Sequence, residues 1–156
     1  MAERFDINAI AREAIRGAGL DRDRHVALRA SLFDPPPEVR GSREQLTAAI
    51  ACLLRSARRS VAGREGAAID LETEPDGDRI AIRILDNGPG LSEDELERIF
   101  DPFVAEPGCV DAPDSKHSRG LAGAGEVFRD HGGTLMVRSR PGEGTCFVAL
   151  LPIAPA

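Results

Sequence analysis

The sequence predicts an α+β fold, a two-layer α/β sandwich with helices on one face of a mixed, mostly antiparallel sheet. Segments with apolar residues at helical spacing are interleaved with segments in which polar and apolar residues alternate. Short turns rich in glycine and proline join pairs of the alternating segments, which favours antiparallel neighbours. With 156 residues, 42% of them hydrophobic, the chain is long enough for one core, so we expect a single domain over residues 1–156.

The first half of the chain is expected to hold two helices and three strands. Asp6 has the character of a helix cap, and Ser42 begins a sequence with capping-box spacing before the longest helix. Residues 1–20 are therefore assigned to a linker and first helix. The expected elements are a helix from Asp6 to about Gly17, a strand over 25–33, a helix over about 42–61, and strands over 67–74 and 79–85.

The second half is expected to add two helices, two strands and one long loop. Gly123 and Gly125 weaken the second of these helices, since each costs about 1 kcal/mol relative to alanine. His131 is expected to lie at its end, as a cation that suits the helix dipole rather than as a catalyst. The expected elements are a helix from about 92 to 99, an irregular loop over 104–119, a helix over 121–131, and strands over 134–140 and 145–151.

Composition excludes several classes of function. The net charge of −6 and the lack of Trp and Tyr argue against nucleic-acid binding. No apolar run is long enough to span a membrane, so no membrane contact is expected. The first residues do not form an apolar signal region, and the three cysteines lack the C-x-x-C spacing of a zinc site. We therefore expect a cytoplasmic location.

The most informative motif, Asp86-Asn87-Gly88-Pro89-Gly90, follows the strand over 79–85. A carboxylate at a strand end, followed by glycines that permit close approach to the backbone, is typical of a binding site. Asp-Asn-Gly is also ordinary turn chemistry, so the motif alone leaves both interpretations open.

Other motifs follow in a specific order. They are Ile99-Phe100-Asp101-Pro102-Phe103, the loop over 104–119, Gly120-Leu121-Ala122, His131-Gly132-Gly133, and Ser139-Arg140-Pro141-Gly142-Glu143-Gly144-Thr145. Together with the Asp86 motif, this order resembles the catalytic and ATP-binding domain of sensor histidine kinases, in the superfamily shared with gyrase, Hsp90 and MutL. The resemblance covers nearly the whole chain and implies the Bergerat ATP-binding fold, in which the loop over 104–119 is the ATP lid.

The resemblance implies roles for residues at the adenine end of a nucleotide site. Asp86 is similar to the aspartate that accepts the adenine amino group, and Thr145 to the threonine that supports this contact through water. Gly88 and Gly90 would let the loop wrap the base. Phe103, with Phe100, matches the phenylalanine motif at the base of the lid, although core packing is an equally compatible role.

The residues expected to contact metal and phosphate, at the other end of the nucleotide site, depart from the family pattern. The family carries two asparagines in a pattern like N-L-L-x-N-A, where this chain has Cys52-Leu53-Leu54-Arg55-Ser56-Ala57. Ser56 stands where an asparagine binds Mg²⁺, and its shorter side chain would reach the ion only through water or a backbone shift. Arg59 matches the basic residue that meets phosphate.

The second glycine-rich motif of the family is also only partly present in this chain. The family pattern G-x-G-L-G-L aligns with Lys116-His117-Ser118-Arg119-Gly120-Leu121, which keeps Gly120 and Leu121. Lys116 and Arg119 could replace lost backbone contacts to phosphate by charge, or could be solvated loop residues.

Three functions remain open, the third of them weaker than the other two. In the first, the chain is a divergent kinase domain that presents ATP and Mg²⁺ to a histidine on a helical phosphoacceptor and dimerisation domain, with a response regulator as the further partner. In the second, it is a pseudokinase-like module that docks signalling proteins with little or no ATP binding. No histidine of this chain is followed by Glu or Asp, as the family phosphoacceptor usually is. A serine kinase of the anti-sigma type is the weaker third alternative. We expect this polypeptide to be monomeric.

Overall fold

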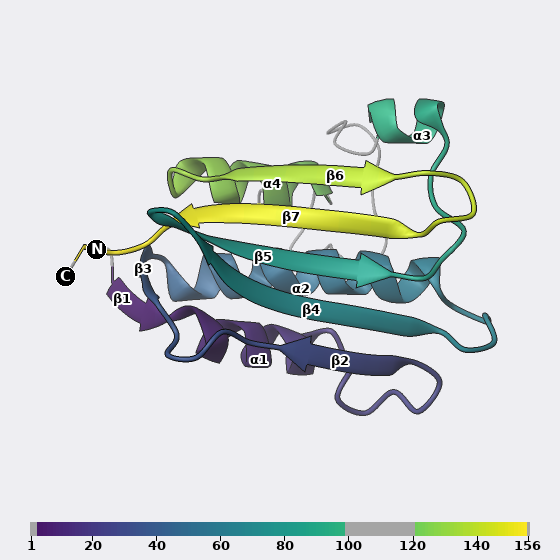
Figure 1. Ribbon diagram of the computed structural model, residues 1–156, viewed down its shortest axis with the longest axis horizontal. Helices are drawn as coiled ribbons and strands as arrows, with labels where there is room; N and C mark the ends of the chain where they lie inside the picture. Colours follow the sequence, from purple (N-terminus) through teal and green to yellow (C-terminus); the bar gives the residue numbers. More distant parts are fainter. Residues whose placement is uncertain (1–2, 99–120, 156) are drawn as a thin grey trace.

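The structure is a computed structural model that describes residues 3–98 and 121–155 (Figure 1). Its elements in chain order are β1 (Glu3–Asp6), α1 (Ile7–Gly17), β2 (Ala27–Ser31), β3 (Glu38–Gly41), α2 (Arg43–Ser60), β4 (Ala68–Asp76), β5 (Arg79–Asp86), α3 (Glu93–Arg98), α4 (Leu121–Asp130), β6 (Thr134–Ser139) and β7 (Thr145–Pro152). No helix in these two ranges has both the length and the apolar character needed to cross a membrane.

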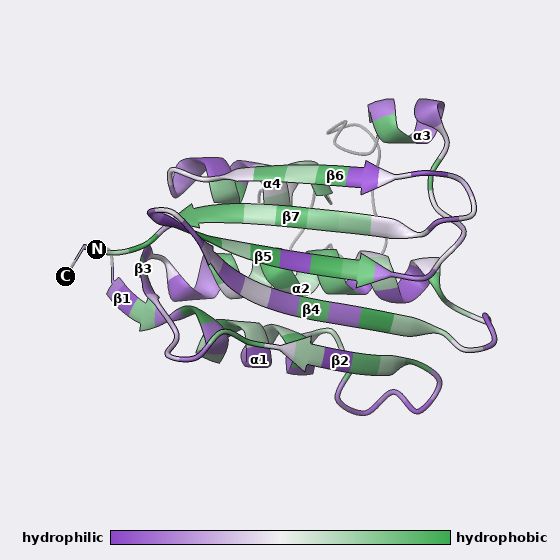
Figure 2. Ribbon diagram, in the orientation of Figure 1, coloured by the Kyte–Doolittle hydropathy of each residue, from purple (hydrophilic) through white to green (hydrophobic). Residues whose placement is uncertain are grey.

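A five-stranded sheet forms one layer, in the order β2-β4-β5-β7-β6. Strands β2 and β4 are parallel, whereas the other neighbours are antiparallel. Helices α1, α2 and α4 lie together on one face of this sheet (Figure 1). Strands β4 and β5 alternate hydrophobic and hydrophilic residues (Figure 2), because one face of the sheet packs on the helices. The predicted two-layer α+β sandwich is confirmed.

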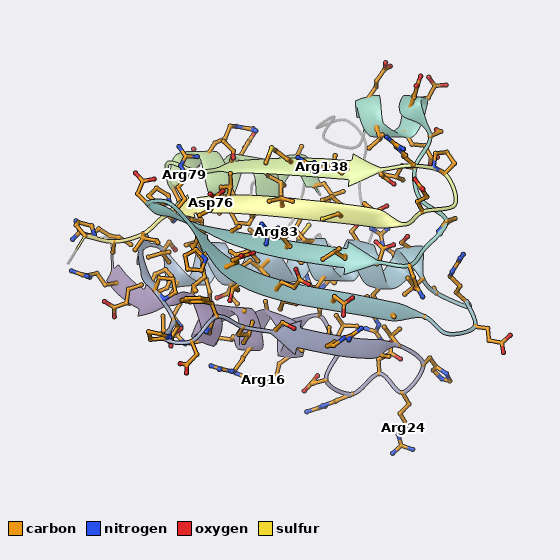
Figure 3. All side chains as sticks on the ribbon, viewed as in Figure 1. Arg16, Arg24, Asp76, Arg79, Arg83 and Arg138 are labelled. Atoms are coloured by element: carbon orange, nitrogen blue, oxygen red, sulfur yellow. The ribbon has the colours of Figure 1, made fainter. Side chains whose placement is uncertain are left out.

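The opposite face of the sheet carries charged side chains. Arg79, Arg83 and Arg138 project from it (Figure 3). Arg83 forms an ion pair with Glu74 of the neighbouring strand, at 2.7 Å. Charged groups on this face explain why β4 and β5 alternate polar with apolar residues.

Two short strands were not expected from the sequence. Strands β1 and β3 pair antiparallel, with Phe5 opposite Val39, and both side chains are buried. Each strand has only four residues, which is too short for alternation to stand out. The expected strand over 25–33 is also shorter in the structure, where β2 is confined to Ala27–Ser31.

The predicted helix caps are confirmed. The Asp6 Oδ1 atom accepts hydrogen bonds from the backbone N–H groups of Asn8 and Ala9. The Ser42 hydroxyl accepts from Gln45 N–H at 3.2 Å. Ser92 and Glu95 bond reciprocally at the start of α3, which completes a capping box.

His131 lies directly after α4, as expected, but the hydrogen bonds of its ring correct the expectation of a cation. Its Nε2 atom accepts a hydrogen bond from the backbone N–H of Ser42 at 3.0 Å. Its Nδ1 atom lies 2.7 Å from the carbonyl oxygen of Val127, which only accepts, so Nδ1 carries the proton. The ring is therefore neutral in this arrangement and ties the end of α4 to the start of α2.

Candidate functional site

A cavity of about 340 Å³ lies where β5 and β7 meet the C-terminal end of α2. The chain brings five segments together there: β5, β7, the last turns of α2, the loop that follows β5, and α3. The lining residues are Ser56, Arg59, Ser60, Asp86, Pro89, Gly90, Leu91, Glu95, Thr145 and Phe147. We call this space the nucleotide cavity, because it contains residues for which the resemblance to sensor histidine kinases predicts contacts with a nucleotide.

Asp86 is the buried charged group of this cavity, with 7% of its surface exposed. Its Oδ1 atom accepts hydrogen bonds from Gly88 N–H at 2.8 Å and from the Ser60 hydroxyl at 3.3 Å. Its Oδ2 atom is buried and has no hydrogen-bond partner among the described residues. Such an oxygen is costly unless a donor reaches it, so the geometry fits a ligand that supplies an N–H group.

The pKa of Asp86 is raised above its ordinary value because burial disfavours the charged carboxylate. Hydrogen bonds from Gly88 N–H and the Ser60 hydroxyl oppose this effect, as do the nearby backbone N–H of Thr145 and the positive charge of Arg64. Burial is the largest of these influences. Keeping the Asp86 carboxylate ionised in this buried position therefore costs free energy, which is common where a carboxylate has a functional role.

The loop after Asp86 is held by contacts within the protein. Asn87 accepts from Ala68 N–H and donates to the Gly66 carbonyl, which fixes the loop to the start of β4. Gly90 has a φ of +77°, and a Cβ there would overlap the carbonyl oxygen of Arg140. The glycine at position 90 is thus required by close packing against the β6–β7 turn. Its expected contact with a base stays a prediction.

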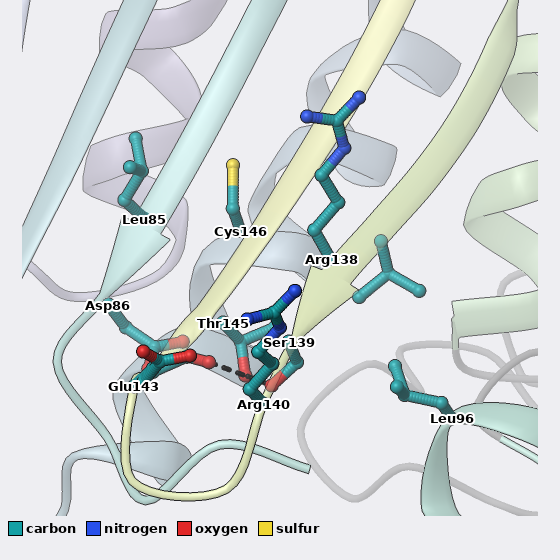
Figure 4. Close-up of a pocket in the computed structure, with 11 residues that line it drawn as sticks. Leu85, Asp86, Leu96, Arg138, Ser139, Arg140, Glu143, Thr145 and Cys146 are labelled. Atoms are coloured by element: carbon teal, nitrogen blue, oxygen red, sulfur yellow. Dashed lines mark hydrogen bonds between the residues drawn. The ribbon is translucent and has the colours of Figure 1, made fainter. Parts of the chain in front are cut away.

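Thr145 lies opposite Asp86 in the β5–β7 register (Figure 4). The Ser139 hydroxyl lies 2.7 Å from the Gly144 carbonyl oxygen, to which it must donate its one proton. It also lies 2.9 Å from Thr145 Oγ1, so the threonine hydroxyl donates to Ser139. Toward the cavity, Thr145 can therefore only accept a hydrogen bond. Asp86 and Thr145 together present acceptors, which suits an amino group or a bridging water.

A second cavity, of about 500 Å³, lies beside the ends of the same strands (Figure 4). It contains the free thiol of Cys146 and the side chain of Leu85. Burial raises the pKa of the Cys146 thiol, which keeps it protonated and poorly nucleophilic. This cavity therefore adds no reactive group to the site.

Helix α2 places Ser56 and Arg59 in the lining of the nucleotide cavity, and their expected contacts with metal and phosphate stay predictions. Cys52, one turn earlier, is buried in the core instead. For Mg²⁺ the fit is poor, because α2 offers the hydroxyl of Ser56 where carboxylate or amide oxygens are preferred. Among the described residues, no group of three or more His, Cys, Asp or Glu side chains is placed to hold a metal.

Several predicted site residues lie outside the described ranges. These are Phe103, Lys116, Arg119 and Gly120, together with the expected lid over 104–119. Leu121 is described, and it begins α4 as a fully buried core residue.

Sequence reasoning missed two polar residues of the site, Ser60 and Ser139. Ser60 lies four residues after Ser56, on the same face of α2, and this spacing could have indicated it. Ser139 lies directly opposite Thr145 in the β6–β7 hairpin, a pairing that the predicted turn over 141–144 would have implied.

Comparisons with known proteins agree with this geometry. The family model described as histidine kinase-, DNA gyrase B-, and HSP90-like ATPase matches residues 41–155. The alginate biosynthesis sensor protein KinB of Pseudomonas aeruginosa is 37% identical over 130 residues, which cover 83% of this chain and 21% of KinB. Sensor histidine kinase ZraS of Escherichia coli K12 is 27% identical over 95% of this chain and 30% of ZraS. The chain thus spans less than a third of these two relatives.

Solved structures share the fold. The mycobacterial sensor histidine kinase MprB aligns with a TM-score of 0.78 and 22% identity, and the whole of both chains is covered. The catalytic domain of histidine kinase ThkA aligns with a TM-score of 0.81 and 20% identity over 99% of both chains. ThkA in complex with response regulator TrrA aligns with a TM-score of 0.76 and 20% identity over 99% of this chain and 42% of that one. With the buried aspartate, the cavity beside α2 and the matching family model, the chain belongs to the histidine kinase-, DNA gyrase B- and HSP90-like ATPase family, as a catalytic ATP-binding domain of the sensor histidine kinase type.

Proposed function

We propose that this domain binds ATP in the nucleotide cavity and presents it to a phosphoacceptor histidine on another domain of a two-component sensor kinase. The supporting observation is the buried Asp86 carboxylate, whose Oδ2 atom lacks a partner among the described residues. A carboxylate only accepts hydrogen bonds, so it selects a ligand with an amino group, such as adenine. Phosphoryl transfer by such a domain depends mainly on positioning and charge neutralisation.

The partners we propose are a helical phosphoacceptor and dimerisation domain and a response regulator. The histidines in the described part of the chain do not suggest a phosphoacceptor within it. His25 is an exposed residue before β2, and His131 is engaged with Ser42 and Val127. The complex of ThkA with TrrA shows that a domain of this fold occurs in a protein that binds a response regulator.

We further propose that the domain is divergent and weakly active, because the metal end of the site is reduced. Mg²⁺, when bound in such a site, neutralises phosphate charge. Ser56 offers a hydroxyl oxygen on a short side chain, and Arg59 brings a positive charge to the same cavity. These residues favour a nucleotide whose phosphates depend little on Mg²⁺ for binding. The same loss favours the second candidate function, a pseudokinase-like docking module.

Calorimetric titration with ATP and ADP, each with and without Mg²⁺, tests the proposal. We expect binding by the wild type and a roughly 10- to 100-fold loss in Asp86→Asn, since a hydrogen bond to a charged group contributes about 1.5–3 kcal/mol. Ser31→Ala, at an exposed position of β2, is the matched control and should bind like the wild type. No binding at millimolar nucleotide would overturn the proposal and favour the docking module.

A further inference from the structure

Ser60 is the last residue of α2, and its hydroxyl faces the carboxylate at the end of β5. The Ser60 hydroxyl donates to Asp86 Oδ1 at 3.3 Å, and Gly88 N–H donates to the same oxygen at 2.8 Å. Two donors from different directions hold Oδ1, so rotation of the carboxylate is restricted. The second oxygen, Oδ2, is the one left buried and unpartnered among the described residues.

The position of Ser60 matters because the C-terminal end of a helix repels negative charge. The last carbonyl groups of α2 carry partial negative charge, and Asp86 lies against this end. Burial disfavours the ionised carboxylate in the same direction. The Ser60 hydroxyl places a donor between the helix end and the carboxylate. It thereby favours the ionised form, which is the form that accepts from a ligand.

Gly88 and Ser60 are sterically coupled. A Cβ on Gly88 would overlap the Ser60 hydroxyl oxygen and would lie 2.8 Å from Asp86 Oδ1. Gly88 is buried, so a side chain there has no open space to occupy. A glycine at position 88 is therefore what allows the serine hydroxyl and the loop N–H to reach one carboxylate oxygen together.

We propose that Ser60 is a positioning residue of the nucleotide cavity: its hydroxyl holds Asp86 Oδ1 so that Oδ2 alone remains to accept an amino group of the bound nucleotide. This inference rests on the proposed nucleotide binding. Other titratable or charged groups lie around the carboxylate, and the positive charge of Arg64 is the one that lowers the Asp86 pKa. These groups are Arg64 after α2, Arg59 and Glu95 in the nucleotide cavity, and Arg138, Arg140, Glu143 and Cys146 of the β6–β7 hairpin.

The first measurement is the titration of the Asp86 carboxyl carbon by NMR in the nucleotide-free protein. Ser60→Ala should raise the midpoint of the Asp86 titration, because a hydrogen bond to the charged form is lost. Ser60→Thr, which keeps the hydroxyl, should restore the midpoint toward the wild-type value. Ser31→Ala should leave it unchanged. An unchanged midpoint in Ser60→Ala would overturn the inference whether or not the protein binds nucleotide.

The second measurement is ATP affinity as a function of pH. Ser60→Ala should bind ATP roughly tenfold more weakly, as expected for one lost hydrogen bond to a charged acceptor. The pH at which binding is half lost should rise with the Asp86 midpoint. Wild-type protein that binds no ATP would defeat the proposed function, whereas wild-type binding with an unaltered Ser60→Ala profile would defeat the role of Ser60 alone.

Discussion

The hydroxyl of Ser139 joins the loop after β5 to the β6–β7 hairpin, and its removal should measurably destabilise the domain. It accepts hydrogen bonds from Leu91 N–H at 2.8 Å and from the Thr145 hydroxyl at 2.9 Å, and it donates to the Gly144 carbonyl at 2.7 Å. A neutral hydrogen bond contributes about 1 kcal/mol net, so complete loss of these bonds costs at most about 3 kcal/mol. Because Leu91 and Ser139 are half-buried, water can form some of the lost hydrogen bonds and reduce this cost. We expect Ser139→Ala to lower the free energy of unfolding by about 1.5–3 kcal/mol.

Urea unfolding monitored by circular dichroism measures this change. Ser31→Ala is the matched control, a serine on an exposed strand position, and should stay within about 0.5 kcal/mol of the wild type. A double-mutant cycle with Thr145→Val should show coupling of roughly 0.5 kcal/mol or more, because the two hydroxyls share one bond. A loss in Ser139→Ala no larger than that of the control, or strict additivity in the cycle, would refute this reasoning.

Three further predictions concern other parts of the fold. The Thr73 hydroxyl accepts from Phe33 N–H at 2.8 Å and donates to Asn8 Oδ1 at 2.9 Å. Thr73→Val removes both hydrogen bonds and should lower the free energy of unfolding by about 2–4 kcal/mol. Thr73→Ser keeps the hydroxyl and should lower it by only about 1 kcal/mol. Equal losses in urea unfolding would contradict this. Burial raises the pKa of Asp86 in the folded state, so protonation of this carboxyl favours folding. This contribution to the free energy of unfolding is complete below the ordinary pKa of 3.8 and is lost as the pH rises through the pKa of the folded state. Asp86→Asn should therefore flatten the fall in stability across this window, and an unaltered profile of unfolding free energy against pH would argue against it. Asp6→Ala should cost about 1 kcal/mol in thermal unfolding, because it removes the cap of α1, while Asp6→Asn should retain most of the stability.

Local patterns in the sequence were sufficient for much of the fold. The cap residues Asp6, Ser42 and Ser92 act on backbone groups two or three residues away, so their roles can be inferred from neighbours in the chain. The alternation in β4 and β5 records which face of the sheet is buried. Asp86 could likewise be identified as a candidate acceptor, because a carboxylate at a strand end before glycines is a local feature.

Contacts between residues distant in the sequence decided the rest. Pairing of β1 with β3 and the bond from Ser42 to His131 join segments tens of residues apart, and no local pattern indicates them. The same holds at the site, where Ser60 and Asp86 are separated by 26 positions and meet only because α2 packs on β5. The sequence alone therefore determined that Asp86 is a candidate acceptor. Only the tertiary structure decided which of its oxygens is held and which is left for a ligand, because that choice depends on donors brought together by packing.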